Sequence, residues 1–179
     1  MIKRIFYSDK KLREKELLFR WNETVDYLKE LFEEHKHTPV GEEILCHLIF
    51  QCWYAFAYLI DTQARYIISQ EIDFYKENWK SAVAKGIDLY YDSPSVCWII
   101  GFTSFTGNKF FKPFKKFGED MMKRGVDLST PEMPFDVLSG KSRKDKNDYY
   151  YIIPSELFPS YCDADKFFYD KLIKLGFNG

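Results

Sequence analysis

"KGIDLYYDSPSVCWIIG", residues 85–101, has the pattern of two helices joined by a short turn. Ser93 followed by Pro94 is typical of a helix start, because serine caps free backbone amides and proline fits the first helical turn. Further along, "RGVDLSTPEMPFDVLSG", residues 124–140, repeats the glycine, the aspartate-leucine pair and the final glycine at the same spacing. We therefore predict two related helix pairs within residues 75–140.

These pairs resemble tetratricopeptide-type repeats, in which the two helices of one unit stack on those of the next. Gly86 and Gly125 occupy equivalent positions, and we expect each to let the two helices of its pair approach closely. The alternative is a chance similarity between two amphipathic helix pairs, because the usual tetratricopeptide unit is nearer to about 34 residues.

Apolar residues recur at spacings of three and four in most of the remaining chain, which is typical of amphipathic helices. Long helices are expected within residues 1–72, and a polar loop with a C-terminal helix within residues 141–179. The predicted helices cover residues 9–36, 41–70, 75–91, 94–105, 114–129, 131–140 and 164–175. No pair of strands is evident, so we predict one all-α domain, a bundle of six to seven helices containing the two related pairs.

The most apolar stretch is "ILCHLIFQCWYAFAYLI", residues 44–60. A helix that spans a membrane needs about 20 mostly apolar residues, and this run is shorter and contains His47 and Gln51. We therefore expect a buried core helix and no membrane partner. The first residues also lack the apolar segment of a signal peptide, which predicts a cytoplasmic protein with reduced cysteines.

Composition limits the classes of partner. Lysine and arginine number 26 and aspartate and glutamate 27, whereas proteins that bind nucleic acids directly usually carry a basic excess. Aromatic residues make up 19% of the chain. Most should fill the core, and those at the surface are suited to anchoring a protein partner. We expect no direct contact with nucleic acid.

Motifs for catalysis or for metal binding are not evident in the sequence. The histidines His35, His37 and His47 match no metal-binding spacing, the four cysteines form no CxxC pair, and no glycine-rich phosphate loop is present. We predict a protein that is not an enzyme and needs no metal or cofactor. The alternative is a helical nucleic-acid-processing enzyme that uses His47 or Arg65.

The segment "DLYYDSPSVCWIIGF", residues 88–102, followed by "FGEDMMKRGVDL", residues 117–128, resembles small helical immunity proteins of bacterial contact-dependent growth-inhibition loci. This resemblance implies a protein that binds a cognate toxin, usually a nuclease domain, and covers its active or substrate-binding surface. The chain is nearly neutral, so local patches must supply charge complementarity. A helical-repeat adaptor that binds a peptide or a partner helix is the alternative.

Candidate partner-binding residues combine tyrosines with neighbouring acids. Tyrosine offers contact area and a hydroxyl, and acids steer a basic surface into place. The alternative is that these tyrosines pack on helices of their own chain. No feature of the sequence indicates an oligomeric state. The candidates are Asp88, Tyr91, Asp92, Asp148, Tyr149 and Tyr150.

Overall fold

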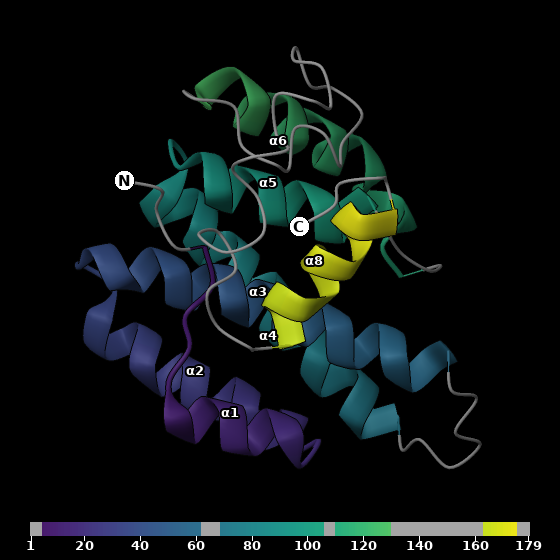
Figure 1. Cartoon of the computed structure of the whole chain (residues 1–179). Coiled ribbons are helices and arrows are strands. Elements are labelled where there is room, and N and C mark those ends of the chain that lie inside the picture. Colours follow the sequence, from purple (N-terminus) through teal and green to yellow (C-terminus); the bar gives the residue numbers. More distant parts are fainter. Residues whose placement is uncertain (1–4, 62–68, 106–109, 130–162, 175–179) are drawn as a thin grey trace.

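The computed structural model describes residues 5–61, 69–105, 110–129 and 163–174 (Figure 1). Within these ranges the chain forms seven α-helices and one short 3-10 helix, which confirms the predicted all-α bundle. The elements are α1 (Lys10–Leu17), α2 (Trp21–His35), α3 (Pro39–Asp61), α4 (Ser69–Tyr90), α5 (Pro94–Phe105), η1 (Lys112–Phe114), α6 (Lys115–Leu128) and α8 (Asp163–Lys174).

Helix α3 lies at the centre of the bundle and packs against α2, α4, α5 and α8. It contains the apolar run that the sequence predicts to be a core helix. By length and composition α3 could cross a membrane, but 67% of its apolar window is buried inside the structure. Such burial is typical of the core helix of a soluble protein.

The expected single helix over residues 9–36 is wrong, because the structure divides it into α1 and α2. The chain reverses between them at Phe19, whose φ is 54°. The reversal lets α1 bury Leu12 while α2 buries a stripe of its own that contains Val25 and Leu28. The free energy gained by burying one face of each helix outweighs the free energy lost when the continuous helix is broken.

The predicted start of α5 is confirmed. The amide of Val96 donates to Ser93 Oγ at 3.2 Å, and the amide of Cys97 donates to the Ser93 carbonyl oxygen at 2.9 Å. Pro94 is the first helical residue. Serine therefore supplies the cap and proline the first turn, as local chemistry predicts.

The two aligned glycines make different contacts. A Cβ atom on Gly86 would lie 3.1 Å from Val96 Cγ1 and 3.0 Å from Ile100 Cδ1, so α4 and α5 do approach each other there. A Cβ on Gly125 would instead meet the backbone of α5, 3.2 Å from the carbonyl oxygen of Pro94 and from the amide nitrogen of Trp98. Residues 131–140 lie outside the described residues, so the second pair and the repeat stay predictions.

Helices α5 and α6 share the most extensive helix-helix packing in the described part of the chain. A Cβ on Gly101 would lie 2.7 Å from the Met122 amide nitrogen and 2.8 Å from the Gly118 carbonyl oxygen. A Cβ on Gly118 would lie 2.9 Å from the Gly101 carbonyl oxygen. Because these neighbours are backbone atoms, the two helices can cross this closely only where side chains are absent. This crossing fixes the position of α6.

Aromatic rings join elements that are distant in sequence. Phe168 of α8 stacks on Phe6 at 5.5 Å between ring centroids and also contacts Phe50 of α3 and Trp98 of α5. A second cluster surrounds Trp79 of α4. Much of the aromatic content therefore lies in the core, as the composition predicts.

Candidate functional site: a groove between α4 and α6

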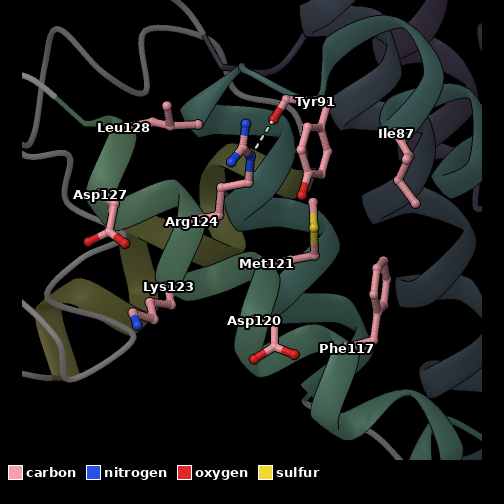
Figure 2. Close-up of a pocket in the computed structure, with 9 residues that line it drawn as sticks. All are labelled: Ile87, Tyr91, Phe117, Asp120, Met121, Lys123, Arg124, Asp127 and Leu128. Carbon is pink, nitrogen blue, oxygen red and sulfur yellow. Dashed lines mark hydrogen bonds between the residues drawn. The ribbon is translucent and has the colours of Figure 1, made fainter.

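A surface groove with a volume of about 410 Å³ lies between the C-terminal end of α4 and the outer face of α6 (Figure 2). We call it the α4–α6 groove. This volume is within the range that bound ligands or inserted side chains usually fill. Its lining residues are Ile87, Tyr91, Phe117, Asp120, Met121, Lys123, Arg124, Asp127 and Leu128.

Helix α6 contributes one side of the groove. Phe117, Met121, Arg124 and Leu128 recur at spacings of three and four, so they share one face of this helix. Gly118 and Gly125 place α6 directly against α5. The packing on α5 therefore holds the groove-lining residues on a rigid support.

Arg124 connects α6 to the turn that follows α4. Its Nε donates to the Tyr91 carbonyl oxygen at 3.0 Å, and its Nη2 donates to Asp92 Oδ1. The guanidinium also lies 3.8 Å from the centroid of the Tyr91 ring, a cation–π contact (Figure 2). Because the Asp92 side chain is 86% exposed, we expect the ion pair to add at most about 1 kcal/mol to stability. The main effect of the Arg124 side chain is to hold the Tyr91 ring in place.

The thiol of Cys97 lies beneath the same turn and donates to the Tyr91 carbonyl oxygen at 3.1 Å. Burial raises the pKa of Cys97 to about 11, although the nearby Arg124 acts in the opposite direction. The thiol is therefore protonated at neutral pH and is not a nucleophile there. Cys97 supports the turn and does not supply chemistry.

The structure brings two of the predicted residues to the groove. Tyr91 lines it with its side chain 46% exposed, and Asp92 lies at its edge, bound to Arg124. Asp88 is exposed on the last turn of α4 and is not among the lining residues. Asp148, Tyr149 and Tyr150 lie outside the described residues, so their roles stay predictions.

Tyr90 differs from its neighbour Tyr91. Its hydroxyl donates to the Lys36 carbonyl oxygen at 2.6 Å, and burial raises its pKa. Tyr90 therefore joins α4 to the end of α2 and is a structural residue. Of the two adjacent tyrosines, Tyr90 is half-buried against its own chain, whereas Tyr91 is exposed at the groove.

The residues of α6 were not among the predicted partner-binding residues. Met121 is buried in the core, and Phe117 and Leu128 are half-buried and pack against it. Only the packing of α6 on α5 through its glycines decides that the edge of this helix face lines the groove.

The groove combines an apolar lining with charged edges. Ile87, Phe117 and Met121 supply the apolar surface, and Asp120 and Lys123 are exposed beside it. Lys116 pairs with Asp120 at 3.0 Å. Such a surface is suited to binding apolar and charged side chains of a partner.

His47, the candidate of the enzyme hypothesis, is fully buried. Its Nδ1 lies 2.6 Å from the Tyr7 carbonyl oxygen and its Nε2 lies 2.8 Å from Glu16 Oε1. These contacts join α3 to α1 and to the N-terminal segment. A substrate cannot reach this imidazole in the described arrangement, and Arg65 lies outside the described residues.

Within the part of the chain that the structure describes, no group of three or more histidine, cysteine, aspartate or glutamate side chains is arranged to hold a metal ion. Cys46, Cys52 and Cys97 are buried free thiols.

Comparisons of the chain with protein-family models, with curated proteins and with solved structures found no match.

Proposed function

We propose that this chain is an immunity protein that binds a cognate bacterial toxin and neutralises it by covering its active or substrate-binding surface. The observation that carries the proposal is the α4–α6 groove, in which an exposed tyrosine ring lies beside an apolar lining and surface acids. The segments that resemble immunity proteins, residues 88–102 and 117–128, contribute most of this groove. The protein acts by occupying a partner, without catalysis, metal or cofactor.

The geometry favours tight binding of a rigid partner surface. Arg124 contacts Tyr91 twice, by a hydrogen bond to its backbone carbonyl oxygen and by a cation–π contact with its ring. A side chain that is already ordered loses little conformational entropy when it is buried at an interface. Aromatic residues of this kind often carry a large share of the binding energy. Tyr91 is therefore the proposed anchor.

The acids around the groove define the chemistry of the partner. Asp88, Asp92, Asp120 and Asp127 are all exposed on α4, on α6 and on the turn after α4. Asp92 pairs with Arg124, and Asp120 pairs with Lys116. A toxin domain that cleaves nucleic acid needs a basic surface to bind phosphates. Carboxylates at the groove edge would accelerate association with such a surface and orient it. We therefore propose a nuclease toxin domain as the partner.

Co-expression with a toxin encoded by the neighbouring gene tests the proposal. The wild-type protein should restore growth and form a complex with the toxin domain. Tyr91→Ala should weaken that complex by about tenfold or more, as expected for an interface anchor. Asp73→Ala, which removes an exposed acid from the other end of α4, is the matched control and should leave the affinity unchanged. A wild-type protein that neither restores growth nor binds the toxin contradicts the proposal.

A helical-repeat adaptor is the second candidate. The apolar lining from Ile87, Phe117, Met121 and Leu128 favours it, because an amphipathic helix binds such a groove through residues three and four apart. Ile87→Lys, at a groove residue that is 37% exposed, discriminates it from non-specific association, since it should abolish capture of a helical peptide. Recovery of such a peptide from cells that carry no toxin gene supports the adaptor, and its absence there favours the immunity protein.

A further inference from the structure

Three consecutive apolar side chains protrude between α1 and α2. Leu17, Leu18 and Phe19 are 77%, 59% and 68% exposed. Most large apolar residues of a soluble domain are buried, and a contiguous exposed group is a common mark of an interaction surface. We call these three residues the apolar tip. In Figure 1 helix α1, which leads into the tip, lies at the opposite end of the bundle from α6.

The backbone of the tip is a Schellman motif. The amide of Arg20 donates to the Lys15 carbonyl oxygen at 3.0 Å, and the amide of Phe19 donates to the Glu16 carbonyl oxygen at 3.0 Å. Phe19 adopts a φ of 54° at the position where this motif usually has glycine. An aromatic side chain is unfavourable in this conformation, so helix termination alone does not explain its presence.

The apolar contact that usually accompanies a Schellman motif is not made by the tip. That contact joins the residue after the left-handed position to one in the last helical turn, and here these are Arg20 and Lys15, both cations. The motif therefore closes the helix through its backbone and directs the apolar side chains into solvent. Strained residues that persist in a fold are often retained for function.

The base of the tip is firmly packed. The Phe19 ring contacts the Trp21 ring edge-on at 5.9 Å, and Trp21 contacts Tyr58 of α3 at 4.7 Å. Trp21 belongs to the buried core. The tip is therefore an ordered protrusion attached to the core and presents its apolar end to solvent.

Cationic residues surround the tip along α1. Lys10 and Arg13 precede Leu17 on one stripe of the helix, at spacings of three and four, and both are exposed. Residues 10–20 contain five basic residues, namely Lys10, Lys11, Arg13, Lys15 and Arg20. They contain two acids, Glu14 and Glu16, and Glu16 is buried against His47. An apolar end with a cationic helix behind it is the combination that binds anionic lipid surfaces.

We propose that the apolar tip and the cationic face of α1 bind an anionic lipid surface. Leu17, Leu18 and Phe19 insert at the boundary between headgroups and acyl chains, and the lysines and arginines of α1 contact anionic headgroups. This peripheral attachment departs from the expectation of no membrane partner, which followed only from the lack of a membrane-spanning helix in the sequence. Helix α3 stays in the core. The inner leaflet of a cell membrane carries the required negative charge, which agrees with the predicted cytoplasmic location.

Electrostatics disfavour the other occupants. A symmetric contact between two copies would place the cationic α1 of one against that of the other, because the same patch faces itself in a two-fold dimer. The proposed toxin surface is basic and would be repelled by α1 as well. Helix α2 carries the exposed acids Glu23, Asp26, Glu30, Glu33 and Glu34. They would be repelled by the lipid, so the approach is restricted to the tip and α1. Glu23 pairs with Lys15 and Arg20, so the headgroup contacts of the proposal fall to Lys10, Lys11 and Arg13.

Vesicle co-sedimentation of the full chain tests the proposal. Wild-type protein should bind vesicles of 70% phosphatidylcholine and 30% phosphatidylserine, bind phosphatidylcholine vesicles weakly, and dissociate as salt is raised. Phe19→Gly should reduce the partition coefficient on the anionic vesicles by about tenfold or more, because it removes the largest inserting side chain. Lys10→Glu with Lys11→Glu should reduce it to a similar extent.

Two controls separate the tip from other causes. Leu89→Ser removes an exposed apolar residue from α4 and should leave vesicle binding unchanged. Phe19→Gly should raise the thermal unfolding midpoint, because glycine adopts a positive φ without strain, so its loss of binding cannot come from unfolding. Failure of the wild type to bind anionic vesicles overturns the proposal. Binding of Phe19→Gly to anionic vesicles as tightly as the wild type also overturns it. A wild-type dimer that Phe19→Gly abolishes, with no binding of the wild type to vesicles, overturns it as well. Toxin neutralisation is measured separately, so either proposal can fail alone.

Discussion

At the scale of single residues, the buried pair of Glu16 and His47 joins segments that are distant in sequence. The two ring nitrogens of His47 lie 2.6 Å from the Tyr7 carbonyl oxygen and 2.8 Å from the Glu16 carboxyl. The pair anchors the N-terminal segment and α1 to α3.

Substitution of Glu16 should distinguish the loss of charge from the loss of the contact. Glu16→Ala leaves a buried imidazole nitrogen without its partner, and we expect it to lower the free energy of unfolding by about 3–5 kcal/mol. Glu16→Gln keeps a group that can donate to Nε2, and its loss should be less than half as large. Urea unfolding followed by circular dichroism measures both values. Equal losses for the two variants would contradict the role of the hydrogen bond.

Gln51 is a second buried polar residue, and its amide has no partner among the described residues. Both Nε2 and Oε1 are buried there without a hydrogen bond. An unsatisfied buried amide destabilises a fold by about 1–3 kcal/mol. Gln51→Met has a similar volume and no such group, so it should raise the urea unfolding midpoint. A lower midpoint would mean that a bound water or another group satisfies the amide in solution.

At the scale of elements, the crossing of α5 and α6 controls the position of the groove. Gly101→Ala would place a methyl group against the Gly118 carbonyl oxygen and Met122, where backbone atoms cannot move aside without shifting a helix. We expect a loss of about 1–3 kcal/mol in the free energy of unfolding, which is typical of overpacking.

Gly86→Ala is the control for this prediction. Its new methyl group would meet the ends of the Val96 and Ile100 side chains, which can turn away. Alanine also gains about 0.5–1 kcal/mol over glycine inside a helix, so its net effect should be small. Chemical unfolding of both variants measures the difference. A loss for Gly86→Ala as large as that for Gly101→Ala would contradict the assignment of the close crossing to α5 and α6.

The elements also differ in how well their bounds follow from sequence. The start of α5 was predictable because serine followed by proline is a local signal. Helix α3 begins at Pro39, two residues before the predicted start at residue 41, and α4 begins at Ser69, inside the predicted range 41–70. The break between α1 and α2 was not predictable, because the apolar spacing continues across it from Leu17 to Trp21. The break is marked by the positive φ of Phe19. The packing of α1 and α2 as separate helices stabilises this conformation.

At the scale of the whole molecule, ionised acids help to join distant elements. Glu33 of α2 accepts hydrogen bonds from Lys85 of α4 and from Lys36, and these lower its pKa to about 2. Burial acts to raise the pKa of Asp9, but hydrogen bonds from the Leu12 amide and from the Tyr27 and Tyr7 hydroxyls outweigh it and lower the pKa below 3.8. Both folded-state pKa values lie below the ordinary values, so both groups stabilise the fold when ionised.

This sign predicts the response to acid. The contribution of these groups is present above pH 4.5, the ordinary pKa of a glutamate, and is lost as the pH falls toward 2 through the folded-state pKa of Glu33. Urea unfolding midpoints should therefore fall between pH 4.5 and pH 2. The double variant Asp9→Asn with Glu33→Gln should be less stable at pH 7 and show a shallower fall. A double variant with the wild-type pH dependence would contradict this assignment.

The whole molecule also separates its two proposed interaction surfaces. Helices α4 and α6 line the groove, and the apolar tip follows α1. Helix α1 lies at the opposite end of the bundle from α6 (Figure 1). A protein held on a lipid surface by the tip would present the groove away from that surface. Both contacts can therefore be made at the same time by one copy of the chain.

The sequence by itself determined the helical class, the buried central helix and the start of α5. These features depend on residues within a few positions of one another, through caps, proline and apolar spacing. Tertiary structure alone decided that Arg124 of α6 holds Tyr91, that Tyr90 faces inward, and that Phe19 protrudes. These outcomes depend on which helix faces pack together. The glycines of α5 and α6 allow their close crossing, but this contact exists only when both helices have formed and packed against each other.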